Sequence, residues 1–227
     1  MSSRFDSIAL RAGLWGGPLF LASLTIFGAL TPGYSHLRKA VSRLGAWDNP
    51  WGLWFDLFGL FIPGLFAVGV AVELRRRLRV LKTNTRWATG LVILCAMFAL
   101  TAVPADFLRM FQSPWTWMHA FFVFGDMVVL FAVIPGCTKA LKTLGAPGAS
   151  TRIFLILGYL PVAEFLLYGV LPQTPGLVQR LMILTVHGAI GWISWTLLRL
   201  PPPAERKEPD SAHEESSICQ ELKKSQL

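Results

Sequence analysis

Residues 51–79 decide the fold class of this chain, and they read WGLWFDLFGLFIPGLFAVGVAVELRRRLR. Asp56 is the only charged residue before Glu73, and a cluster of arginines follows at once. About 20 apolar residues in a helix cross a hydrocarbon core about 30 Å thick. An apolar run that ends in basic residues is typical of a transmembrane helix anchored at the membrane surface.

The same pattern recurs along the chain and predicts an all-α protein, a six-helix transmembrane bundle. The six expected spans are residues 9–30, 51–73, 87–103, 117–135, 153–171 and 177–200. We therefore expect one domain over residues 1–200. Residues 201–227 begin PPPAERKEPDSAHEESS, which is too polar to bury a core, and predict a disordered cytoplasmic tail.

Charge placement predicts the orientation. Only 15% of the 227 residues are charged and 53% are hydrophobic, whereas soluble domains carry about 25% charged residues. Of the 21 lysines and arginines, 16 fall on the side of the termini and five on the other. By the positive-inside rule both termini are expected in the cytoplasm, with the plasma membrane or bacterial inner membrane as the default location. Because the net charge of +8 flanks apolar runs, we expect contact with membrane lipids and no nucleic acid.

The loop of residues 31–50 has a pattern of its own. Leu37, Ala40, Val41 and Leu44 recur at helical spacing, while basic residues lie off that stripe. This spacing predicts a short amphipathic helix lying along the outer interface.

Ionisable residues inside the expected spans are the strongest functional signal, because a charge in the hydrocarbon core is costly. Asp56, Asp126, Glu164 and His187 lie within spans, in the outer half or near the midplane. His119 lies seven residues before Asp126, hence on the same helix face. Each acid could instead pair with a neighbouring side chain and only join helices, and that alternative stays open.

Residues nearer the outer ends of the spans extend this set, while recognised motifs are missing. Asp106 and Arg180 lie at those outer ends. The sequence contains no HExxH, GxSxG or P-loop motif. His119 and His187 are too few for the paired histidines of a two-haem membrane cytochrome. We therefore expect no cofactor and no metal site.

Three segments resemble the family catalogued as domain of unknown function 998, a set of small integral membrane proteins. They are PGYSHLRKAVSRLGAWDNPWG (32–52), VPADF (103–107) followed by His119, and GLVQRLMILTVHGAIGWISWTLLRL (176–200). The chain departs from the family pattern at FLRMFQSPWTWM (107–118). The resemblance implies a helical membrane bundle and no established activity. It marks the polar positions Tyr34, Arg38, Ser42, Gly45, Asp106, His119 and Arg180.

Three functions remain open at this stage. We expect binding or transformation of a lipophilic small molecule, a lipid or isoprenoid, in an outward-facing polar cavity within the membrane. A proton-coupled small-solute transporter and a structural or accessory membrane subunit are the alternatives, and a homo-oligomer is compatible with each. The expected catalytic residues are Asp56, Asp126, Glu164 and His119, and the expected substrate-binding residues are Asp106, Arg180, His187, Tyr34 and Arg38.

Overall fold

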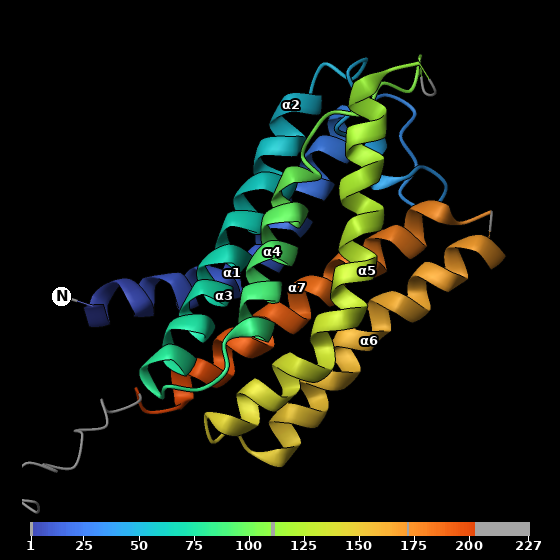
Figure 1. Cartoon of the computed structure of the whole chain (residues 1–227). Coiled ribbons are helices and arrows are strands. Elements are labelled where there is room, and N and C mark those ends of the chain that lie inside the picture. The colour runs from blue at the N-terminus through green and yellow to red at the C-terminus, as the bar shows by residue number, and fades with distance from the viewer. Residues whose placement is uncertain (1, 110–111, 172, 203–227) are drawn as a thin grey trace, which may run out of the picture.

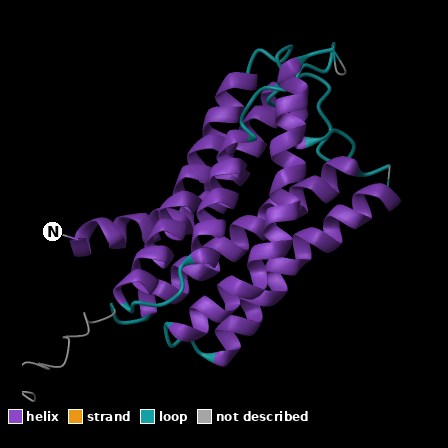
Figure 2. Ribbon diagram, viewed as in Figure 1, coloured by secondary structure: helices purple, strands orange, loops and turns teal. Residues whose placement is uncertain are grey.

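The computed structural model describes residues 2–109, 112–171 and 173–202, apart from the side chains of residues 2–6, 168 and 169. Its regular structure within these ranges is entirely helical, which confirms the all-α class (Figure 2). The elements are α1 (Ser2–Leu30), η1 (Val41–Arg43), α2 (Gly52–Phe55), η2 (Asp56–Phe61), α3 (Ile62–Val80), α4 (Arg86–Leu100), α5 (Pro114–Thr143), α6 (Gly148–Val170) and α7 (Pro175–Arg199). Residues 203–227, most of the expected tail, lie outside the described ranges.

Five of the helical stretches are long and apolar enough to cross a membrane. They are Ser7–Leu30, Gly52–Val80, Pro114–Thr143, Gly148–Leu167 and Pro175–Arg199. The helix α4 is apolar but has 15 residues, or about 22 Å at 1.5 Å per residue. The chain is therefore an integral membrane protein with at least five helices of spanning length and a sixth, shorter one.

The helices form a closed ring in which each packs on its neighbours. Going round the ring, α1 packs on α3, α3 on α4, α4 on α5, α5 on α6, α6 on α7 and α7 on α1. Successive helices run in alternating directions, so the start of α1 and the end of α7 lie toward the same end of the bundle (Figure 1). We call this the terminal end. The opposite end, where residues 31–51 and 101–113 connect the helices, is the long-loop end.

A buried arginine joins two helices at the terminal end. Arg77 of α3 donates to Glu73 Oε1 at 2.8 Å and to the Leu197 carbonyl of α7, also at 2.8 Å. Both charged side chains are buried. Since the last carbonyls of a helix have no partner within it, Arg77 caps the end of α7 and fixes it to α3.

The expected amphipathic helix in the 31–50 loop is wrong. Only one 3₁₀ turn, Val41–Arg43, forms there, and Leu37 is 47% exposed. The reason is that α7 takes the backbone groups that a helix would need. The Leu37 carbonyl accepts from the backbone N–H of Leu177, and the Val41 N–H donates to Gln179 Oε1 at 2.6 Å. Instead of lying free along the interface, the loop is bound to the start of α7.

The second span contains a local change of helical pitch. A π-helical turn, Asp56–Phe61, links α2 to α3, which begins with Pro63 in its first turn. Proline has no N–H and its ring clashes with the carbonyl four residues earlier, so a regular α-helix cannot run through it undisturbed. The wider turn places Asp56, Gly59 and Leu60 on the buried side of the bundle.

Candidate functional site

A cavity lies inside the ring of helices. On one side of it is the larger cluster of buried hydrophobic residues, in the terminal half of the bundle, and on the other side is a smaller cluster beneath the 31–50 loop. Helices α4, α5 and α7 supply most of its wall, and Leu60, Ala67, Val41 and Ser42 complete it. Its free volume is about 800 Å³ when the open mouth is included, but water centres can reach only about 60 Å³. One water needs about 10–15 Å³ by that measure, so the cavity has room for roughly four to six water-sized groups.

Apolar and sulfur-containing side chains make up most of the lining. Met127 of α5, Met182 of α7 and Cys95 of α4 contribute sulfur atoms, and Phe98 contributes an aromatic ring. Thioethers are flexible and polarisable, so they adapt to ligands of irregular shape. The polar lining residues are Ser42, Thr101, His119, Asp126, Gln179 and His187.

Asp126 brings a carboxyl group into this apolar surrounding. It lies near the middle of α5, and its side chain is 4% exposed. The preceding residue is Gly125, where an added Cβ would lie 2.4 Å from Met97 Cε of α4. The glycine thus leaves room for the end of the Met97 side chain beside the carboxyl group. Within the described residues, Asp126 Oδ1 has no hydrogen-bond partner.

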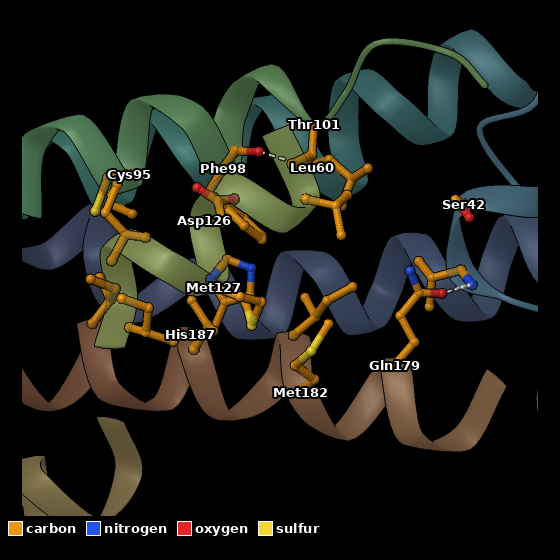
Figure 3. Close-up of a pocket in the computed structure, with 18 of the residues that line it drawn as sticks. Ser42, Leu60, Cys95, Phe98, Thr101, Asp126, Met127, Gln179, Met182 and His187 are labelled. Carbon is orange, nitrogen blue, oxygen red and sulfur yellow. Dashed lines mark hydrogen bonds between the residues drawn. The ribbon is translucent and has the colours of Figure 1, made fainter. Parts of the chain in front are cut away.

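His187 enters the same cavity from α7. Its ring packs against Phe20 of α1 and Phe98 of α4, with centroids 5.8 and 5.3 Å apart. Space for the ring comes from Gly16 of α1, where an added Cβ would lie 3.0 Å from His187 Nδ1. The residue is 5% exposed, and no described group hydrogen-bonds to its Nε2. Figure 3 shows Asp126 and His187 in one cavity, although they lie on different helices.

His119 lies closer to the long-loop end, two turns before Asp126 on α5. Its Nδ1 is 3.0 Å from the Val103 carbonyl, so this nitrogen carries a proton and donates to that oxygen. Gln179 and Ser42 mark the loop side of the cavity (Figure 3). The structure thus brings three of the expected site residues, Asp126, His119 and His187, to a single cavity.

The other expected catalytic acids lie elsewhere. Asp56 is 4% exposed beneath the loop, where an added Cβ on Gly45 would lie 1.8 Å from its Oδ1. It does not line the cavity. Glu164 of α6 is 7% exposed and accepts a hydrogen bond from Thr185 Oγ1 of α7 at 2.7 Å. That geometry is the helix-joining arrangement considered above as the alternative for each acid.

Tyr34 and Arg180 form a tie between the loop and α7. Arg180 donates from Nη2 to the Tyr34 hydroxyl and from Nη1 to the Lys39 carbonyl at 3.1 Å, and its guanidinium lies 5.4 Å from the centre of the Tyr34 ring. Burial raises the pKa of Tyr34, and Arg180 offsets this only in part. The phenol therefore stays neutral and donates to the Ala40 carbonyl at 3.2 Å.

The two remaining expected residues lie at the surface of the long-loop end. Arg38 is exposed on the loop. Asp106 accepts from the backbone N–H groups of Leu108 and Arg109, each at 3.1 Å, and so shapes its own loop. It borders a shallow polar hollow at the long-loop end, apart from the cavity.

Some contributors to the cavity carried no signal in the sequence. Gln179 and Thr101 are neutral polar residues at helix ends, and nothing in their spacing distinguishes them. Gln179 both lines the cavity and holds the Val41 N–H of the loop. The described part of the chain contains no cluster of three or more histidine, cysteine, aspartate or glutamate residues arranged to hold a metal ion.

Comparisons with known proteins place the chain in one family. Searches of curated proteins and of solved structures each give no significant match. Residues 14–196 match the family described as "Protein of unknown function (DUF998)". This stretch covers most of the chain and includes the first two segments that resemble the family and all but the last four residues of the third. The chain therefore belongs to the DUF998 family.

Proposed function

We propose that this protein binds a lipophilic small molecule in the cavity between α4, α5 and α7, with Asp126 and His187 as its polar contacts. One observation carries the proposal. Asp126 Oδ1 and His187 Nε2 are both buried, both lack a partner in the described residues, and both side chains line one cavity.

Buried polar atoms are nearly always hydrogen-bonded, because an unpaired one costs about 1–3 kcal/mol. Two such atoms at one cavity therefore suggest that something else satisfies them. The apolar lining favours a molecule that is mostly hydrocarbon, with a small polar group that reaches the carboxyl and imidazole groups.

The rest of the bundle favours binding over conduction. Between the cavity and the terminal end, a large apolar cluster fills the ring, including Leu74, Leu141 and Leu197. The Arg77 tie then joins α3 to α7 at that end. A cavity with one closed end suits a bound molecule better than a solute crossing the membrane.

The proposed setting is a six-span bundle in which α4 is the shortest span. Its end is extended by Thr101, whose backbone N–H still bonds to the Met97 carbonyl. The distribution of basic residues supports termini in the cytoplasm. The cavity mouth, bordered by the 31–50 loop, would then face the outer leaflet.

Native mass spectrometry of protein extracted in a mild detergent tests this function. We expect a bound lipophilic molecule whose occupancy falls in Asp126→Asn and in Val123→Trp, which fills the cavity from α5. Asp106→Asn is the matched control, since that carboxylate lies outside the cavity, and it should retain the molecule. If wild type carries no molecule and takes up none from a panel of lipids, the binding function is wrong.

A further inference from the structure

The groups at the cavity restrict the chemistry of the head group that would bind there. This inference rests on the binding function proposed above. Asp126 Oδ1 is a carboxyl oxygen and His187 Nε2 a ring nitrogen, and neither has a partner among the described groups. A hydroxyl group has one donor and two acceptor sites, so it can donate to the carboxyl oxygen while it accepts from an imidazole N–H.

An anionic head group fits poorly. None of the residues that line the cavity is lysine or arginine. Arg180 follows the lining residue Gln179 but does not itself line the cavity; its two terminal nitrogens donate to Tyr34 and to the Lys39 carbonyl, and its Nε has no partner among the described groups. A carboxylate or phosphate would therefore lie beside Asp126 in an apolar site without a counter-charge, which is costly.

A cationic head group fits less well than a neutral one. An ammonium could pair with the Asp126 carboxylate, but both charges would have to leave water, and their attraction often fails to repay that cost. A hydroxyl group loses far less on leaving water and makes the same number of contacts.

The lining of the cavity favours a hydrocarbon chain beside the head group. Apart from the polar residues named above, its walls are leucine, isoleucine, valine, methionine, alanine, phenylalanine and cysteine side chains. Helix α5 packs on α4 and α6, and α7 packs on α1, α3 and α6, so α5 and α7 face each other across the cavity. The loop that covers the long-loop end is bonded to α7 through Gln179, Arg180 and the backbone of Leu177. Val41 and Ser42 of this loop border the cavity mouth, where a molecule from the outer leaflet would enter.

From these observations we infer that the ligand is a membrane-dissolved alcohol with a hydrocarbon chain, whose hydroxyl group binds Asp126 and His187. The class includes long-chain alcohols and lipids with one free hydroxyl group.

Photo-crosslinking in lipid nanodiscs tests this assignment with three probes. The probes share one unbranched diazirine-bearing alkyl chain and end in a hydroxyl, a carboxylate or a primary amine. Labelling of cavity-lining peptides of α5 and α7 is divided by labelling of the exposed outer face of α5, which carries Phe121, Phe124 and Phe131. That ratio corrects for the different solubility of the probes in the bilayer.

We expect the hydroxyl probe to exceed the other two in this ratio by about five- to tenfold, the factor that one net hydrogen bond supplies. Asp126→Leu and His187→Phe should each remove most of that preference, whereas Asp106→Asn should leave it unchanged. Two variants on different helices guard against the misfolding of either one.

The outcomes separate this inference from the binding function. Equal ratios for the three probes, or a preference for the amine or carboxylate, would overturn the alcohol assignment while leaving a lipophilic ligand in the cavity. Labelling confined to the outer face of α5 with every probe would overturn both.

Discussion

Replacing Asp126 by leucine tests whether the Asp126 carboxyl group serves to bind a ligand or to stabilise the fold. The side chain is 4% exposed, and its Oδ1 has no described partner. An unpaired buried polar atom costs about 1–3 kcal/mol, and leucine would add apolar contacts to a largely apolar cavity. We therefore expect the free energy of unfolding of the ligand-free protein to rise by about 1–3 kcal/mol in Asp126→Leu.

Glu164→Leu is the matched control, because Glu164 is also a buried acid in a span but has a partner. It would lose the 2.7 Å hydrogen bond from Thr185 Oγ1. Since that hydroxyl also lies 2.9 Å from the Leu181 carbonyl, it keeps an acceptor after the change. We expect Glu164→Leu to lower the free energy of unfolding by about 1 kcal/mol.

Unfolding by sodium dodecyl sulfate in mixed micelles measures both changes, with the fluorescence of the nine tryptophans as the signal. The samples must first be freed of lipophilic molecules, because a ligand bound to wild type would mask the gain. A fall in stability for Asp126→Leu as large as for Glu164→Leu would refute the reasoning. It would mean that the Asp126 carboxyl group is a structural contact.

Three further changes test the parts of the structure that hold the cavity in place. Arg180→Met should release the loop from α7 and lower the free energy of unfolding by about 2–3 kcal/mol, with faster proteolysis within residues 31–51 as a second measurement; unchanged proteolysis would count against the tie. Arg77→Met should cost about 3 kcal/mol in the same unfolding assay, whereas Arg79→Met, at an exposed position of the same helix, should change stability by less than about 0.5 kcal/mol; equal effects would contradict the capping role. Gly45→Ala should cost about 1–3 kcal/mol or more, because the new Cβ would lie 1.8 Å from Asp56 Oδ1, and combining it with Asp56→Ala should recover part of the loss; strictly additive effects would show that the two residues do not press on each other.

The 31–50 loop shows where reasoning from sequence fails. Its hydrophobic spacing predicts a helix, and two of the four residues in that pattern, Val41 and Leu44, are buried. Spacing describes which side chains can share a face, but it does not show which partner the backbone will choose. Here α7 competes for the backbone groups with its own N–H, a guanidinium and an amide oxygen.

The acids show the same limit in a different form. The cost of charge in a membrane correctly singles out the buried positions Asp56, Asp126 and Glu164, since all three are under 10% exposed. Yet Asp56 lies under the 31–50 loop, Asp126 lines the cavity, and Glu164 is hydrogen-bonded to Thr185. Counting residues along a helix gives the depth of a side chain in the membrane. It does not show which neighbouring helix that side chain faces.

What the sequence determined by itself is therefore local. Long apolar runs bounded by basic residues specify membrane helices, because each helix satisfies its own backbone in lipid and needs no partner to do so. What only the tertiary structure decided is which side chains meet. Asp126 and His187 lie 61 positions apart, and Arg180 lies 146 positions from Tyr34. Such pairs depend on how the helices of the ring tilt and rotate against one another, which is set by side-chain packing over the whole bundle rather than by any single stretch of sequence.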